Sequence, residues 1–243
     1  MIADVWTVIW KEWKMIRPQR GGVRGGMIGL LIVIGIPGIF LPLQMGRLWV
    51  ESPIAIVLVY VSLIMVTNVT ADSFAGERER HTLETLLASR LSDRAILFGK
   101  VGADAGYGWG LTLSGMFVGL VTVNFAYGRG ELLLYPPVVG LGIVVLSLLA
   151  AGLASGAGIL ISLRASTVLQ AQQKMTIALF LLLFIPSFGA GALPAEWKAR
   201  LAEMLSTDLT KIVLIAAAIL IVLDIGLLCA AMARFKRTRL ILD

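Results

Sequence analysis

A dense block of charged residues interrupts a sequence that is otherwise mostly apolar. The segment 73–90, SFAGERERHTLETLLASR, carries acidic and basic side chains together: Glu77, Arg78, Glu79, Arg80, His81, Glu84 and Arg90. A segment that only set the orientation of a membrane protein would need basic residues alone. Interleaved charges of both signs favour a partner protein with complementary polar groups. We therefore predict a docking site here, and the alternative is a solvated loop.

Helical spacing in the same segment separates apolar from charged side chains. The spacing predicts one short amphipathic helix over 77–87, lying along the membrane surface. Its two faces carry Leu83, Leu86 and Leu87 on one side and Glu77, His81 and Glu84 on the other. Ser92 stands where it can cap the next helix.

The residue types that most often build metal sites and catalytic triads are scarce. Cys229 is the one cysteine and His81 the one histidine of the chain. An intrachain disulfide and a thiolate metal cluster are thereby excluded, and a histidine-based metal site or triad is disfavoured. We expect no catalytic residue and no metal ligand in this chain.

The composition requires a lipid environment. Hydrophobic residues make up 58% of the sequence and charged residues 15%, whereas a soluble domain carries about a quarter charged residues. Runs of about 20 apolar residues can cross the bilayer as helices. The sequence has six such runs, at 25–43, 53–74, 101–125, 137–163, 175–193 and 209–233. We predict an all-α polytopic membrane protein with six transmembrane helices in a single domain.

The distribution of positive charge predicts the orientation. Most of the 21 Lys and Arg residues lie before the first run, after the second, after the fourth and in the C-terminal tail. The positive-inside rule then places both termini in the cytoplasm. Since these basic residues sit at helix ends, where anionic lipid explains them, we expect no nucleic-acid partner.

Two segments outside the runs are amphipathic. Within 1–24, the residues Trp6, Trp10 and Trp13 recur at helical spacing beside basic residues, which predicts a cytoplasmic helix in the headgroup layer that contacts membrane lipid. The alternative is a helix packed against the protein's own spans. The segment 194–208 predicts a short amphipathic helix at the outer surface.

Polar residues inside the predicted spans need an explanation, because charge in hydrocarbon is costly. Asn68 and Asp72 share one face of the second span, Thr176 lies at the start of the fifth, and Asp224 lies deep in the sixth. Each residue either serves a transport path or makes a structural hydrogen bond to a neighbouring helix.

The charged segment and the residues after it resemble a segment of ABC-2 type transporter permeases. That family pattern has a Phe, a Glu-rich pair, Thr-Leu-Glu-x-Leu-Leu and, further on, Gly-Lys. The matching residues are Phe74, Glu77, Glu79, Thr82, Leu83, Glu84, Leu86, Leu87, Gly99 and Lys100. The pattern commonly has Gly where this sequence has His81 and Pro where it has Arg90.

The resemblance implies an ABC-2 (type V exporter-like) fold and the membrane subunit of an ATP-binding cassette exporter in the cell membrane. The sequence has no G-x-x-x-x-G-K-[ST] loop, so ATP and Mg²⁺ would bind a separate ATPase subunit, present in two copies. A second permease chain, identical or related, would complete the assembly. The segment of the coupling helix would comprise Glu77, Arg78, Glu79, Arg80, His81, Thr82, Leu83, Glu84 and Leu87. The substrate path would include Asn68, Asp72, Thr176 and Asp224.

Three other functions remain open at this point. A gradient-driven secondary transporter or a channel would use Asp72, Asp104 and Asp224 as a relay. An intramembrane enzyme would need His81 inside the bilayer, whereas the prediction puts it in a cytoplasmic helix. A membrane anchor would let ATPase cycling signal instead of export. Co-purification of an ATPase separates the first of these from a permease.

Overall fold

Long helices make up most of the fold. The computed structural model describes residues 1–16, 29, 31–192, 194, 196–197 and 208–235, and within these residues there are helices and turns but no strand. Among the described residues, four stretches are long and apolar enough to cross a membrane. They are η2 with α5 (Pro53–Leu58 and Val59–Glu79), α7 (Asp93–Tyr127), α8 (Pro137–Ser162) and α11 (Leu209–Arg234). The prediction of an all-helical, multi-pass membrane protein is confirmed.

The predicted count of six spans depends on two further segments. Helix α9 (Val168–Ala192) has 25 residues and lies over the fifth predicted span. The first predicted span begins outside the described residues and continues as the apolar helix Leu31–Met45. This helix contains a π-helical turn, η1 (Ile36–Phe40), and α3 (Leu41–Met45), and is followed by α4 (Leu48–Glu51). Most of the amphipathic segment predicted at 194–208 lies outside the described residues.

Helix ends follow familiar capping chemistry. The Ser92 hydroxyl accepts a hydrogen bond from the Ala95 amide at 3.2 Å, which confirms the predicted cap and starts α7 at Asp93. Asp208 caps α11 in the same way, through the amide of Thr210 at 3.0 Å. Such side chains satisfy amide groups that the first helical turn leaves without partners.

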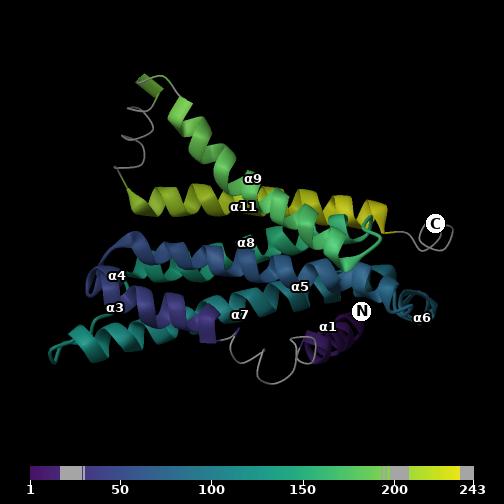
Figure 1. Ribbon diagram of the computed structural model, residues 1–243, viewed down its shortest axis with the longest axis horizontal. Coiled ribbons are helices and arrows are strands. Elements are labelled where there is room, and N and C mark those ends of the chain that lie inside the picture. Colours follow the sequence, from purple (N-terminus) through teal and green to yellow (C-terminus); the bar gives the residue numbers. More distant parts are fainter. Residues whose placement is uncertain (17–28, 30, 193, 195, 198–207, 236–243) are drawn as a thin grey trace.

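Helices α5, α7 and α8 form the centre of the bundle, with α11 against α8 (Figure 1). Gly108 of α7 allows the closest approach, because a Cβ atom at this position would overlap Val66 of α5. Small residues at such crossings let helix backbones come together in lipid. Helix α9 packs on α5 and α8 near its start and leaves the bundle at an angle (Figure 1).

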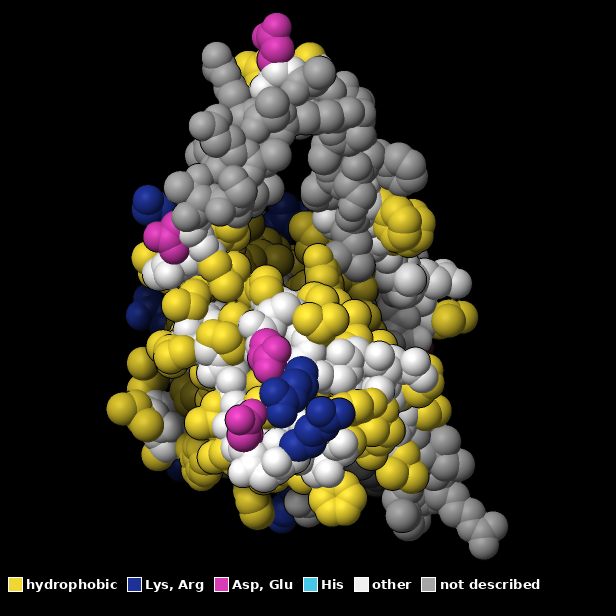
Figure 2. Space-filling view, turned by 90° about the vertical axis from the view of Figure 1, so that its left-hand side faces the viewer, with side chains coloured by type: hydrophobic (Ala, Val, Ile, Leu, Met, Phe, Trp, Pro, Cys, Tyr) yellow, Lys and Arg dark blue, Asp and Glu magenta, His cyan; other side chains and the backbone are white. Residues whose placement is uncertain are grey.

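The two ends of the bundle differ in composition. Figure 2 shows the end at which α4 lies, where a few acidic and basic side chains gather on a mainly hydrophobic surface. Here the Arg47 guanidinium contacts Glu131 at 3.3 Å and donates to the Tyr127 carbonyl at 3.3 Å. The other end carries α6 (Leu83–Ala88) and α1 (Ile2–Ile16), and both the N-terminus and the end of α11 lie on this side (Figure 1).

Candidate functional site

The charged segment forms a helix end, a turn and a second helix, so the prediction of one helix over 77–87 is wrong. Helix α5 ends at Glu79 and α6 begins at Leu83. The amide of Thr82 donates to the Glu77 carbonyl at 2.9 Å, and the amide of His81 donates to the Arg78 carbonyl at 3.1 Å. With His81 at φ 55°, this is the Schellman arrangement that ends many helices.

The turn places His81 in a backbone conformation that suits Gly better than a residue with a side chain. A residue at that position needs a positive φ, which costs a side chain about 1 kcal/mol and costs Gly nothing. We predict that His81→Gly stabilises the protein by up to about 1 kcal/mol, whereas His81→Val destabilises it. Thermal unfolding of the detergent-solubilised protein measures both. A His81→Gly variant that unfolds at a lower temperature than the parent would contradict this description of the turn.

Helix α6 is anchored through one face and exposed on the other. Leu83 and Leu86 are buried against Phe74 of α5, and the same core includes residues of α7, α8 and α11. His81, Thr82 and Glu84 are exposed. The side chain of Leu87 lies outside the described part of the structure. The exposed face of α6, with the turn before it, is the surface that a partner protein can reach.

Glu77 lies on the opposite, buried side. Its carboxylate contacts the Lys11 ammonium of α1 at 2.6 Å and the Lys100 ammonium of α7 at 3.2 Å. Lys100 also contacts Glu12 of α1 at 2.9 Å and donates to the Ser73 carbonyl at 2.8 Å. Lys11, Glu12, Glu77 and Lys100 form what we call the buried charge cluster. It joins α1, α5 and α7.

The buried charge cluster balances its own charge, with two ammonium groups and two carboxylates. The Lys100 side chain is 0% exposed and that of Glu77 1% exposed. The Lys100 ammonium also lies 4.9 Å from the centre of the Phe74 ring. A buried ion pair adds little net stability over an apolar pair, but removing one partner costs about 3–5 kcal/mol because a charge is left unpaired. The cluster therefore fixes α1 on α5 and α7.

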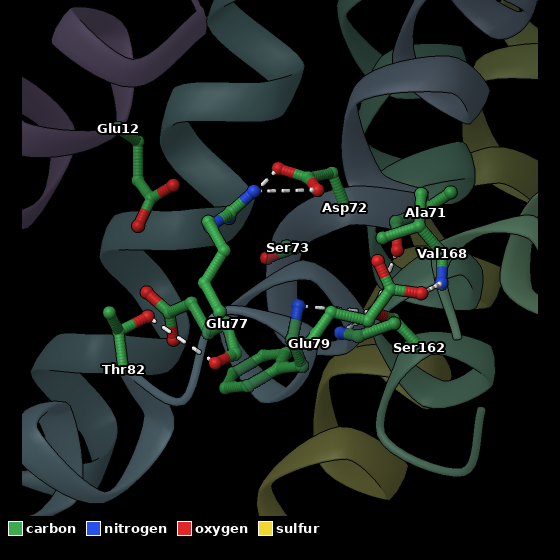
Figure 3. Close-up of polar contacts among 12 residues, drawn as sticks. Glu12, Ala71, Asp72, Ser73, Glu77, Glu79, Thr82, Ser162 and Val168 are labelled. Carbon is green, nitrogen blue, oxygen red and sulfur yellow. Dashed lines mark hydrogen bonds and ion pairs between the residues drawn. The ribbon is translucent and has the colours of Figure 1, made fainter. Parts of the chain in front are cut away.

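The next two charged residues hold the connection between α8 and α9. The Arg78 guanidinium donates to the carbonyls of Ala165 and Leu163, at 2.5 and 3.2 Å. The Glu79 carboxylate accepts from the amide of Val168, the first residue of α9, at 2.8 Å (Figure 3). The Arg78 cation lies at carbonyl groups after the end of α8, and the Glu79 anion lies at an amide group at the start of α9. Both charges interact favourably with the dipoles of these helices.

Ser162 of α8 connects the same region from the interior. Its hydroxyl accepts from the amides of Phe74 and Ala75, at 3.0 and 2.9 Å, and donates to the Ala71 carbonyl at 3.2 Å. Figure 3 shows Ser162 beside Ala71. Since Ser162 is fully buried, this contact ties the end of α5 firmly to the end of α8.

Arg80 folds back along its own helix. Its guanidinium contacts both carboxylate oxygens of Asp72, each at 3.1 Å (Figure 3). Gly76 lies between the two side chains, and a Cβ atom at Gly76 would overlap the Asp72 carboxylate. The pair is partly exposed, and such pairs contribute about 0–1 kcal/mol. Its effect is to hold the turn before α6 against α5.

Of the four residues predicted for a substrate path, none lies in the buried charge cluster. Asn68 on α5 and Thr176 on α9 are exposed, and Asp72 is paired with Arg80. Asp224 on α11 faces α8, where a Cβ atom at Gly152 would lie 3.1 Å from its carboxylate. Their role in a substrate path stays a prediction.

Helix α1 has one packed face and one exposed aromatic face. Val8 is buried against Gly99 of α7. Trp6, Trp10 and Trp13 are 66%, 57% and 47% exposed, as a helix in the headgroup layer requires. The structure thus combines the two alternatives considered from the sequence, and the contact with lipid stays a prediction.

Sequence reasoning missed the partners of the charged segment. Lys11, Glu12 and Ser162 are not among the candidate site residues, and Lys100 is predicted only as part of the family pattern and as a possible partner of Asp72 or Asp104. One signal was available: Lys11 and Glu12 are charged neighbours on a helix that also carries the aromatic stripe. The contacts themselves join residues up to 91 positions apart, a separation at which periodicity carries no information.

The comparison with known families agrees with this architecture. Residues 34–215 match the model of a family described as ABC-2 family transporter protein. The match covers all of α3 to α9, including the charged segment, and the first residues of α11, and it excludes α1. No curated protein matches the chain.

Proposed function

Since the chain belongs to the ABC-2 transporter family and is a multi-pass membrane protein, we propose that it is the permease subunit of an exporter that a separate ATPase drives through α6. The ABC-2 permeases normally pair with an ABC ATPase subunit. In this proposal the end of the bundle that carries α6, the N-terminus and the end of α11 faces the cytoplasm, and so do both termini. The chain crosses the membrane six times, with α9 and the helix that contains α3 as the remaining spans.

The observation that carries the proposal is the set of contacts made by Glu77, Arg78, Glu79 and Arg80. These four consecutive residues contact α1 and α7, the end of α8, the start of α9, and α5 itself. A partner that displaced α6 would therefore act on most of the bundle at once. A solvated loop would need none of these contacts.

The exposed face of α6 offers a partner His81, Thr82 and Glu84 without disturbing the buried leucines. Two ATPase chains would bind ATP and Mg²⁺, and nucleotide binding would bring these two chains together. The two permease chains would then alternate between inward-open and outward-open states. The closed ATPase pair must bind one permease state better than the other, since coupling is a difference in affinity between states. Glu77 does not contact the ATPase in this proposal. It takes part in the coupling because it links the end of α5 to α1 and α7.

The proposal is tested by purifying the affinity-tagged chain in a mild detergent. We expect a nucleotide hydrolase to co-purify, and vanadate to inhibit ATP hydrolysis by the reconstituted complex. Recovery of a stable, folded chain with no hydrolase, from cells that express the neighbouring genes, would contradict the proposal and favour a gradient-driven transporter.

A further inference from the structure

The contacts of the charged segment with α1, α7 and α8 are more deeply buried than its contact with the start of α9. On one side, Glu12, Glu77 and Lys100 of the buried charge cluster and the Ser162 hydroxyl lie in the interior and join α1, α5, α7 and α8, and the side chain of Lys11 is partly exposed. On the other side, Glu79 is exposed and forms one hydrogen bond to the start of α9. Buried ionic contacts are lost only at a large cost, whereas exposed ones break and re-form readily.

Helix α9 packs on the bundle mainly through its first half. Its first half contacts α5 and α8 through small side chains and Met175, in a core with Ala71, Ala75 and Ala171. Gly158 of α8 makes room for Met175, because a Cβ atom at Gly158 would lie 2.5 Å from the Met175 Cε atom. The contact between Met175 and Gly158 therefore holds α9 close to α8 at this position.

Beyond Met175, Leu179 of α9 packs against a second core, which α5, α7 and α8 form. An apolar cavity of about 300 Å³ lies between α5, α8, α9 and α11, lined by residues such as Leu63, Leu153 and Leu179. The helix leans away from the other helices along the same stretch (Figure 1). Helix α9 is therefore held through its first half, and the cavity separates part of it from the bundle.

We propose that α9 is the helix that moves during the transport cycle, and that it pivots at the contact between Met175 and Gly158. Arg78 and Glu79 are the positioning residues that link α9 to the turn before α6. Helices α1, α5, α7 and α8 then move as one body. The inference rests on the proposed function, because it names the part of the permease that the ATPase displaces.

The cavity gives the movement room. Closing α9 onto the bundle would fill the apolar space with side chains of α9 itself, and opening it would enlarge that space on the side of α5. Because Arg78 holds the end of α8 and Glu79 the start of α9, a displacement of the turn acts on the short connection 163–167 from both sides.

Distances between spin labels test this proposal in the complex with its co-purified ATPase. The single cysteine, Cys229, is replaced by serine, and labelled chains are diluted with unlabelled ones. One pair joins the exposed residues Leu181 of α9 and Leu148 of α8, and a control pair joins Thr7 of α1 and Phe117 of α7. Each is changed to cysteine and measured without nucleotide and with ATP and vanadate.

We expect the α9–α8 distance to shift by several ångströms on trapping with vanadate and the α1–α7 distance to stay constant. Glu79→Gln should reduce the α9–α8 shift at least twofold while the ATPase still co-purifies. An unchanged α9–α8 distance in a complex that hydrolyses ATP would overturn the inference and leave the proposed function standing, as would an equal shift in the α1–α7 pair. Failure of any ATPase to bind the chain would instead overturn the proposed function.

Discussion

Replacing Lys100 by methionine is expected to lower the free energy of unfolding by about 3–5 kcal/mol, the largest effect of any single change considered for this protein. Methionine keeps the approximate length of the side chain and removes the charge. Glu12 then loses its nearer ammonium partner, at 2.9 Å, and Glu12 and Glu77 are left to share the single ammonium group of Lys11, at 3.6 and 2.6 Å. Thermal unfolding in detergent, followed by circular dichroism, measures the loss.

Two further variants separate charge balance from packing. Lys14→Met removes an exposed lysine from the same helix as Glu12, and should change stability by no more than about 0.5 kcal/mol. The double variant Lys100→Met with Glu12→Gln leaves the ion pair Lys11–Glu77 balanced, and should recover part of the lost stability. Equal stability of Lys100→Met and the parent would show that the buried charge cluster does not hold α1 in place.

Reversing the charge of Glu84 is expected to weaken binding of the ATPase about tenfold or more and to leave the permease folded. Glu84 is exposed on α6, whereas the neighbouring Leu83 and Leu86 anchor the helix. Glu84→Lys therefore changes the surface and leaves the core intact. Titration of the detergent-solubilised permease with the purified ATPase measures the dissociation constant.

The control is Glu51→Lys, which reverses an exposed glutamate at the opposite end of the bundle, on α4. It should leave the dissociation constant unchanged. Glu77→Lys should instead reduce the yield of folded protein, because the new ammonium group would lie beside Lys11 and Lys100. A Glu84→Lys variant that binds the ATPase as tightly as the parent would remove α6 from the docking surface.

The sequence was sufficient for features that depend on local patterns. Apolar runs predict the four helices that are long enough to span, because hydrocarbon requires long uninterrupted apolar stretches. The cap at Ser92 and the buried positions of Leu83 and Leu86 follow from local spacing as well. The apolar run at 101–125 lies within the longer helix α7, which begins at Asp93 after the predicted cap, because the first turns of that helix carry polar residues.

Features that depend on tertiary contacts could not be predicted. The helical spacing of the sequence continues from Glu77 to Glu84, yet the chain turns at His81. Hydrogen bonds from the amides of His81 and Thr82 to carbonyls of the preceding helix stabilise the positive φ of this turn. The role of Glu77 depends on two lysines, in α1 and in α7, that come near only in the folded bundle. Charge pattern alone therefore placed Glu77 on the surface with Glu84, and the fold separates them.

Photo-cross-linking from α6 tests the central claim most directly. A photoreactive amino acid is placed at the exposed residue Thr85 of α6, or, as a control, at Leu132 near the opposite end of the bundle. The account predicts an adduct with a nucleotide hydrolase from Thr85 and none from Leu132. A hydrolase that is bound to the permease but forms no adduct from Thr85, or forms it equally from Leu132, would contradict it.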